Sequence, residues 1–276
     1  YIEASAKQLV GCEINFPGIS VTGTENIMMA AVLAKGQTIL RNVAKEPEVK
    51  DLENFLNSMG AQITGAGTDE IIINGVKDLS ESTYAIPADR IEAGTYLIAA
   101  TVTFGDITIK NIQADRMNNI LDKLKLSGAN IIIGNDTIQL SMTNSSINPV
   151  DISTAPFPGF PTDMQAQFSV LNALSNGSAV VTENVFENRF MHVQELNRMG
   201  CDITVKGSNA FVRGVNSITG APVMATDLRA SASLILAGLC AEGETIVDRI
   251  YHIDRGYERI EEKLSYLGAD ITRLPN

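Results

Sequence analysis

Apolar and polar positions repeat along this chain with a period of about 70 residues. A phrase with leucine first, glycine fifth and isoleucine last occurs four times, as LNSMGAQI, LKLSGANI, LNRMGCDI and LSYLGADI, at residues 56–63, 124–131, 196–203 and 264–271. A second glycine stands 23 to 25 residues before the glycine of each phrase. Regular self-similarity of this kind is the signature of a repeated structural unit. The chain is therefore predicted to contain four copies of one unit.

The first half of each copy predicts a buried helix followed by a strand. In the last copy the helix spans residues 227–241, which are rich in alanine and leucine. A helix that is apolar on all sides is expected in a core. A short β-branched run follows at residues 245–247, and its counterpart in the first copy is residues 38–40. Such runs favour strands.

The second half of each copy predicts an amphipathic helix and two short strands. In the last copy apolar residues recur at helical spacing, namely Tyr257, Ile260, Leu264 and Leu267. The glycine of the closing phrase is expected to cap this helix. Two brief strands should follow, as at residues 61–64 and 71–73 of the first copy. The predicted unit is βαβαββ, and the predicted fold class is α/β.

The position of the copies predicts two domains. The first complete copy is expected to start at the polar turn that begins with Ser20, with its apolar helix running from Ile27, and residues 1–6 are expected to be the closing strand of another copy. A proline turn at Pro87 is a candidate domain junction. Residues 1–87 would then hold one complete unit and a terminal strand, and residues 88–276 would hold three units.

Composition narrows the possible partners. The chain has 276 residues, 45% of them hydrophobic and 19% charged, which is ordinary for a globular protein. No apolar run approaches 18 residues and the first residues form no secretory signal, so we expect a cytoplasmic protein without a membrane role. A net charge of −11 argues against a nucleic-acid partner. Cys12, Cys201 and Cys240 fit reduced buried thiols better than disulfides or a metal site. No cofactor is expected.

Arginine is concentrated in the last two copies. Eight of the 11 arginines lie after residue 188, and this side chain suits bidentate contacts with carboxylates and phosphates. The turn at residues 20–26 could also bind an anion at a helix N-terminus, or could be an ordinary cap. Asp89 is interpreted as a helix cap.

The third and fourth copies carry the densest polar clusters. A loop with three prolines leads to Asp163, which could be a pre-organised functional carboxylate or a structural N-cap. His192 could be a packing residue or a base. If the inner helices are parallel, five charged residues would converge on one face, either to bind a ligand or to form ion pairs with one another: Asp163, Arg189, Asp227, Arg229 and Arg255.

Four phrases connect these residues with a known family. They are FPTDMQAQF, ENRFMHVQEL, ATDLRASASL and HIDRGYERIEEKL, at residues 160–168, 187–196, 225–234 and 252–264. In these phrases, and along all 276 residues, the chain closely resembles the enolpyruvyl transferases that act on UDP-N-acetylglucosamine. The resemblance implies two inside-out α/β barrel domains around a cleft. It also implies transfer of the enolpyruvyl group of phosphoenolpyruvate to the 3-hydroxyl of UDP-N-acetylglucosamine with release of phosphate, the first committed step of peptidoglycan synthesis.

The resemblance also implies roles for individual residues. Asp163 would contact the sugar 3-hydroxyl and be the candidate base, and Arg229 and Arg255 would hold phosphoenolpyruvate. Arg189 and Asp227 would orient the substrates and the arginines. Three further substrate contacts carry over: Ser20 and Val21 in a nucleotide-binding turn, and the main chain of Val185.

The family's Lys-Asn pair and its mobile loop with a catalytic cysteine and an arginine have no counterpart here. They would precede Tyr1, so the chain is expected to be the carboxy-terminal two-thirds of the enzyme and inactive alone, with the missing segment in the same polypeptide. Two alternatives stay open. One is the family branch that acts on shikimate 3-phosphate, and the other is a non-catalytic relative that senses nucleotide sugars.

Overall fold

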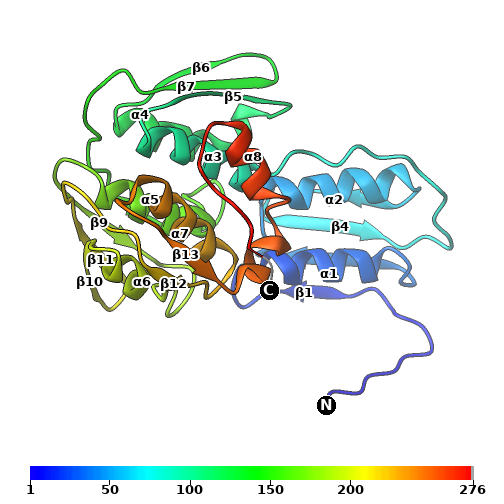
Figure 1. Cartoon of the computed structure of the whole chain (residues 1–276). Helices are drawn as coiled ribbons and strands as arrows, with labels where there is room; N and C mark the ends of the chain where they lie inside the picture. Colours follow the sequence, from blue (N-terminus) through cyan, green and yellow to red (C-terminus); the bar gives the residue numbers. More distant parts are fainter. Residues whose placement is uncertain (275–276) are drawn as a thin grey trace. The chain divides into compact units, whose positions relative to one another are not determined.

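The computed structural model describes residues 1–274 and divides into two compact units (Figure 1). The first comprises Tyr1–Pro87 with Pro156–Pro158, and the second comprises Ala88–Ala155 with Gly159–Asn276. Both are mixed α/β structures in which the same helix and strand arrangement recurs.

The first unit is one four-stranded sheet with two helices packed against it. The strand order is β1-β2-β4-β3, with β1 parallel to β2 and the other neighbours antiparallel. Alternate residues of β4 are buried, including Ile71 and Ile73 at 0% exposure, because they face the helices. The elements are β1 (Glu13–Asn15), α1 (Val21–Ala31), β2 (Gln37–Arg41), α2 (Pro47–Ser58), β3 (Gln62–Thr64) and β4 (Glu70–Asn74).

Two expectations for the first unit were wrong. Helix α1 begins at Val21 rather than at Ile27, because the Ser20 side chain accepts a hydrogen bond of 3.1 Å from Gly23 N and caps the helix there. Residues 1–6 form no strand, since they are exposed and have no ladder partner. The strand that leads this unit is β1, which pairs with β2.

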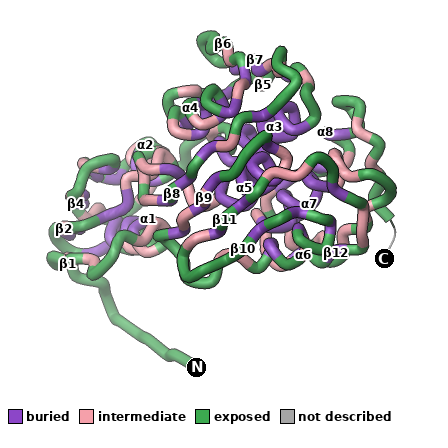
Figure 2. Tube along the Cα trace, turned by 90° about the vertical axis from the view of Figure 1, so that its left-hand side faces the viewer, coloured by how far each residue is buried: buried purple, intermediate pink, exposed green. Residues whose placement is uncertain are grey.

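The second unit is built around three buried helices, α3 (Arg90–Val102), α5 (Gln165–Ala173) and α7 (Leu228–Cys240). They pack on one another, and the buried trace follows them in Figure 2. Every residue of α5 is buried, and in α3 only Glu92 is not. The apolar helices that the repeat predicts as core elements are therefore core elements.

Shorter elements surround these helices. Helices α3 and α4 pack on the antiparallel sheet β5-β7-β6, and α5 and α6 pack on the sheet β10-β11-β9-β8, in which β8 and β9 are parallel. Strands β12 and β13 form a parallel pair. The strands are β5 (Asp106–Lys110), β6 (Asn130–Ile133), β7 (Thr137–Ser141), β8 (Ile152–Ser153), β9 (Ser178–Thr182), β10 (Asp202–Lys206), β11 (Asn209–Arg213), β12 (Pro222–Met224) and β13 (Ile246–Asp248). The remaining helices are η1 (Ala114–Met117), α4 (Asn118–Leu126), η2 (Thr162–Met164), α6 (His192–Arg198), η3 (Ile250–Arg255) and α8 (Ile260–Tyr266).

The copies differ in completeness. The first and third contain all six elements of the βαβαββ pattern, whereas the second lacks a leading strand and the fourth ends with α8 within the described residues. The expectation of three complete units after Pro87 is corrected accordingly. The six described residues after Gly268 are too few for two strands and a turn.

Tyr257 and Leu267 lie outside the helix that was predicted to contain them. Helix α8 starts only at Ile260, because Arg259 has a φ of 47°, which a helix does not tolerate. Tyr257 is instead in the turn after η3, where it is fully buried, and Leu267 is 51% exposed. The fourth copy thus replaces the first turns of a helix by a short 3-10 segment.

The closing phrase has the same backbone conformation in all four copies. Its glycines, Gly60, Gly128, Gly200 and Gly268, have φ values of 98°, 106°, 97° and 101°, which confirms that they cap the preceding helices. In two copies an asparagine adds a second connection. Asn57 bonds both the N–H and the carbonyl of Ile63, and Asn197 bonds both groups of Ile203.

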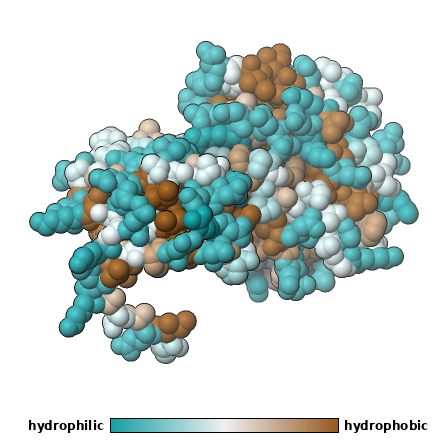
Figure 3. All heavy atoms as spheres, turned by 180° about the vertical axis from the view of Figure 1, so that it is seen from behind, coloured by the Kyte–Doolittle hydropathy of each residue, from teal (hydrophilic) through white to brown (hydrophobic). Residues whose placement is uncertain are grey.

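The surface offers few extreme features. On the face shown in Figure 3 hydrophilic residues predominate, and apolar atoms lie in separate groups. No described helix has the length and apolar character needed to cross a membrane.

Cys201 is buried and Cys240 half-buried, and burial raises the pKa of both thiols to about 12. Cys12 was expected to be buried but is exposed, because it lies in an irregular stretch before β1.

Candidate functional site

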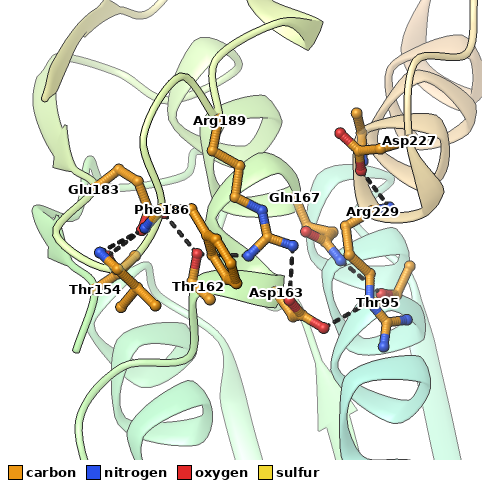
Figure 4. Close-up of polar contacts among 12 residues, drawn as sticks. Thr95, Thr154, Thr162, Asp163, Gln167, Glu183, Phe186, Arg189, Asp227 and Arg229 are labelled. Atoms are coloured by element: carbon orange, nitrogen blue, oxygen red, sulfur yellow. Dashed lines mark hydrogen bonds and ion pairs between the residues drawn. The ribbon is translucent and has the colours of Figure 1, made fainter. Parts of the chain in front are cut away.

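The candidate site is centred on the Asp163 carboxylate, in the 3-10 turn η2 that leads into α5. One of its oxygens accepts a hydrogen bond of 2.7 Å from Nη2 of Arg189, and the other accepts one of 3.1 Å from Nε of Arg229 (Figure 4). Burial alone would raise the pKa of Asp163, but the two guanidiniums outweigh burial and lower it below its ordinary value. Asp163 is therefore a carboxylate held between two cations.

Comparison between the copies shows that Asp163 differs from its counterparts. Asp89 and Asp227 occupy the same position in the second and fourth copies, and each caps its helix by accepting from the N–H groups two and three residues ahead. Asp163 makes no such capping bond, and α5 has no side-chain N-cap among the residues that the structure describes. The structure therefore rejects the capping interpretation of Asp163. Its carboxylate is directed at arginines rather than at its own helix.

Arg229 projects from the first turn of α7, where its side chain is 11% exposed. Besides bonding Asp163, its Nη2 lies 3.9 Å from Asp89, and its guanidinium lies 5.4 Å from the centre of the Tyr257 ring. The buried Nη1 has no hydrogen-bond partner among the described residues. A buried, unpartnered guanidinium donor is costly, and it leaves Arg229 able to bond a further acceptor.

The Tyr257 ring beneath Arg229 is itself fixed by the inner helices. Its hydroxyl lies 2.9 Å from Oγ1 of Thr95 on α3, and Gln167 on α5 donates to both hydroxyls, at 3.2 Å to Thr95 and 3.5 Å to Tyr257. All three residues are buried. The support of Arg229 therefore extends into the core.

Arg189 lies on the loop between β9 and α6. Its Nη1 donates a hydrogen bond of 2.6 Å to Oγ1 of Thr162, the residue before Asp163, and its guanidinium lies 4.9 Å from the centre of the Phe186 ring. Thr162 in turn donates to Glu183 at 2.7 Å. Arg189 is thus fixed on three sides with one end on Asp163 (Figure 4).

His192 is buried at 1% exposure, and its Nε2 has no hydrogen-bond partner in the part of the chain that is described. Burial lowers the pKa of His192 to about 4, opposed by Asp227 and assisted by Arg189. The imidazole is therefore neutral at pH 7. Burial favours the interpretation of His192 as a packing residue.

The remaining predicted site residues have other local surroundings. Ser20 caps α1 in the first unit and Val21 is its first residue. Val185 is 38% exposed and donates its N–H to Glu183 at 2.8 Å. Asp227 caps the helix that carries Arg229. Arg255 is exposed at the end of η3 and makes no side-chain hydrogen bond or ion pair within residues 1–274.

The structure therefore joins three of the five charged residues that were expected to converge, namely Asp163, Arg189 and Arg229. Sequence reasoning missed Thr162, Glu183 and the support that Tyr257 gives to Arg229. Alignment of the copies did not single out Asp163, because the third and fourth copies both read Thr-Asp at this position and the aspartate of the fourth caps its helix. No signal in the sequence pointed to Glu183 either.

The two guanidiniums carry donors that can bind an anionic group. The carboxylate between them can accept a proton from a hydroxyl placed beside it. Within the described residues, no group of three or more His, Cys, Asp or Glu side chains is placed to hold a metal ion. The chemistry open to this cluster is anion binding combined with proton transfer.

Comparison with proteins of known sequence gives consistent results. The chain is 59% identical over 275 residues to the UDP-N-acetylglucosamine 1-carboxyvinyltransferase of Coxiella burnetii (strain Dugway 5J108-111), covering 99% of this chain and 63% of the relative. It is equally identical over 273 residues to the protein of that name from Hydrogenovibrio crunogenus (strain DSM 25203 / XCL-2), covering 65% of it. The chain thus spans less than two thirds of the length of these relatives.

Solved structures and a sequence model of a family complete the comparison. The enolpyruvyl transferase NikO from Streptomyces tendae superposes with a TM-score of 0.87 at 27% identity, over 98% of this chain and 67% of that one. EPSP synthase from Acinetobacter baumannii shares the fold, with a TM-score of 0.71 at 20% identity over 96% of this chain and 64% of that one. The expected enolpyruvyl transferase fold is therefore confirmed. The family model described as EPSP synthase (3-phosphoshikimate 1-carboxyvinyltransferase) matches residues 1–264, and the chain belongs to this family of enolpyruvyl transferases.

Proposed function

We propose that the protein transfers the enolpyruvyl group of phosphoenolpyruvate to the 3-hydroxyl of UDP-N-acetylglucosamine and releases phosphate, a reaction of peptidoglycan synthesis. The observation that carries the proposal is the Asp163 carboxylate, which is not used for capping and lies between two arginines. The identity of 59% to relatives named for this reaction supports the choice of substrates.

In this reaction the sugar oxygen replaces the phosphate oxygen on the enol carbon of phosphoenolpyruvate. The hydroxyl must lose its proton, and the phosphate must leave with its charge. Asp163 is the group that takes the proton, since the turn η2 fixes its carboxylate and a positioned acid-base group contributes roughly 10² to 10⁴ in rate. Arg229 and Arg255 bind the carboxylate and phosphate of phosphoenolpyruvate, as planar guanidiniums do.

The contacts of Arg229 suggest how the two substrates communicate. A low pKa makes Asp163 a weak base, and Arg229 is one cause of that low pKa. When Arg229 bonds an anionic substrate, the negative charge of that substrate offsets the positive charge that acts on Asp163. The Asp163 pKa then rises toward its ordinary value, and the carboxylate becomes a better proton acceptor when phosphoenolpyruvate is present.

The other residues position these groups. Arg189 orients Asp163 through its hydrogen bond to the carboxylate. Asp227 orients the helix that carries Arg229 by capping it. The main chain of Val185 contacts the sugar nucleotide, and Ser20 and Val21 belong to a nucleotide-binding turn at the N-terminus of α1. We also propose that the protein is cytoplasmic and that the chain comprises two domains, with the boundary in the sequence near Pro87.

The test is phosphate release from phosphoenolpyruvate by the complete gene product, with UDP-N-acetylglucosamine or shikimate 3-phosphate as acceptor. The proposal expects release with the sugar nucleotide only. The family description that matches this chain makes the shikimate acceptor the second candidate, and release with it alone would reverse the assignment. Binding of UDP-N-acetylglucosamine in a thermal-shift assay without any phosphate release would favour a non-catalytic sensor.

A further inference from the structure

Glu183 is a buried carboxylate that no role proposed above uses. It directly follows β9, and 4% of its surface is exposed. Its Oε1 accepts hydrogen bonds from Thr154 Oγ1 at 2.9 Å, Val185 N at 2.8 Å and Phe186 N at 3.0 Å. Its Oε2 accepts one of 2.7 Å from Thr162 Oγ1. Four donors therefore converge on one carboxylate (Figure 4).

The donors that bond the two threonine hydroxyls fix the direction of the hydrogen bonds from these hydroxyls to Glu183. Asn184 N donates to Thr154 Oγ1 at 2.8 Å, and the Arg189 guanidinium donates to Thr162 Oγ1 at 2.6 Å. A backbone N–H and a guanidinium can only donate. Each threonine hydroxyl therefore accepts from its outer neighbour and directs its own proton at Glu183. The central group must accept all four bonds, which a carboxylate does and an amide does not.

Both branches of this network end on residues of the candidate site. One runs from Glu183 through Thr162 to Arg189, whose other nitrogen bonds Asp163. The other holds the backbone N–H groups of Val185 and Phe186, and the Phe186 ring lies under the Arg189 guanidinium. One buried side chain thus connects the η2 turn with the loop that carries Arg189.

We propose that Glu183 is a positioning residue, which fixes the Arg189 guanidinium against Asp163 through Thr162 and through the Val185–Phe186 backbone. The expected effect of Glu183 on turnover rests on the proposed function. The expected effect on the Asp163 titration rests on geometry alone. Without the carboxylate, Thr162 has no acceptor for its proton, and the bond from Arg189 to Thr162 has no fixed direction.

The informative substitution is Glu183→Gln, because it keeps the shape of the side chain. Its carbonyl oxygen can still accept from Thr154, Val185 and Phe186, whereas its NH₂ faces Thr162 Oγ1, which already accepts from Arg189. The variant should therefore disturb the Arg189 branch and retain the loop. Thr162→Val removes the same branch from its other end, and Thr162→Ser keeps it.

The first measurement is steady-state turnover of the complete gene product. Glu183→Gln and Thr162→Val should each lower kcat by roughly ten- to a hundredfold with a smaller change in KM for the sugar nucleotide, because misplaced catalytic geometry costs rate. The double variant should be no slower than the worse single variant, since both break one chain of bonds. Thr162→Ser should keep most of the wild-type kcat, because serine retains the hydroxyl.

The second measurement does not depend on activity. It follows the Asp163 carboxyl carbon by NMR as the pH is varied, with Asp163→Asn to assign its signal. Among the described residues only Arg189 and Arg229 bond this carboxylate, so a loosened Arg189 should move the Asp163 titration to higher pH in Glu183→Gln and in Thr162→Val. Glu53→Gln is the matched control, because Glu53 is a buried carboxylate that accepts a backbone N–H bond in the first unit. It should leave the titration unchanged.

The outcomes separate the two proposals. An unchanged Asp163 titration in both variants, with kcat unchanged or reduced only as much as by Glu53→Gln, would overturn the role of Glu183. A wild-type protein without phosphate release would overturn the proposed function, and the titration would still test Glu183. If Glu183→Gln fails to fold, Thr162→Val and Thr162→Ser test the same branch of the network.

Discussion

Arg189 donates a hydrogen bond of 2.7 Å to Asp163, although 26 residues separate them in sequence. The bond joins the loop after β9 to the turn before α5, two connections of the same copy of the repeat. Because a second arginine approaches the same carboxylate from α7, neighbouring copies share one charged centre. The site therefore depends on packing between copies as well as on the residues of one copy.

Asp163→Ala in the complete gene product should lower kcat by roughly 10² to 10⁴, and should lower UDP-N-acetylglucosamine affinity much less. A base acts in the transition state, whereas binding uses many other contacts. Steady-state rates and calorimetric binding measure the two effects separately. Equal losses in rate and in binding would contradict the assignment of Asp163 as the base.

Arg255→Lys should weaken the response to phosphoenolpyruvate and leave folding intact. The side chain is exposed and makes no ion pair within the described residues, so stability should not depend on it. Lysine keeps the charge but loses the forked donors of arginine. The comparison is KM for phosphoenolpyruvate together with the melting temperature.

Arg213→Lys is the matched control for Arg255→Lys, since Arg213 is also exposed and, in the part of the chain that is described, pairs only with Asp202 at 3.3 Å. Arg213→Lys should change neither KM for phosphoenolpyruvate nor the melting temperature. A lower melting temperature of Arg255→Lys with unchanged kinetics would show that Arg255 is a structural residue.

Acid should destabilise the protein through His192. Its pKa is about 4 in the folded state against an ordinary value of 6.5, so the unfolded chain binds the proton first. The neutral imidazole stabilises the fold fully above pH 6.5, and this contribution is lost as the pH falls toward 4. The total is about 3 kcal/mol at 1.36 kcal/mol per pKa unit.

Urea unfolding of the wild type and of His192→Leu at several pH values measures this contribution. The wild type should lose stability relative to the variant between pH 6.5 and 4. Parallel pH profiles of the two proteins would exclude His192 as the cause.

Asn197→Ala should destabilise the second unit by about 1 to 3 kcal/mol, because it leaves the N–H and carbonyl of Ile203 without their partner. The control is Lys125→Ala, at the same position of the second copy, where the side chain only reaches Asp122 at 3.3 Å on the surface. It should cost less than about 0.5 kcal/mol. Equal effects of the two substitutions in thermal unfolding would show that the asparagine bonds contribute nothing.

The sequence predicted the fold better than it predicted the contacts of the site. Spacing of the closing phrase identified the repeat, and the positive φ of its glycines has a local cause that sequence reveals. Helix α1 was placed too late because Val21 and Thr22 do not extend the apolar pattern, yet the Ser20 cap starts the helix there. Local capping thus overrode periodicity.

The contacts of the site could not be predicted in the same way, because they join residues far apart in the sequence. Asp163 and Asp227 are both aspartates before an inner helix, and only their side-chain partners distinguish them. Asp227 bonds its own backbone, whereas Asp163 bonds arginines 26 and 66 residues away. Glu183 was missed because a buried glutamate is recognisable only once four donors surround it. Which donors surround a side chain is known only from the tertiary structure.

The asparagine connections of the closing phrase also bear on the order of folding. Asn57 and Asn197 bond residues only six positions ahead, so forming these turns closes very short loops and costs little chain entropy. The parallel pairs β1–β2 and β8–β9 join residues such as Glu13 with Ile39 and Ile152 with Val181, and local contacts generally form before such distant ones. The helix-to-strand turns should therefore be structured in the folding transition state. Asn197→Ala would then slow refolding more than it accelerates unfolding, which a chevron plot measures.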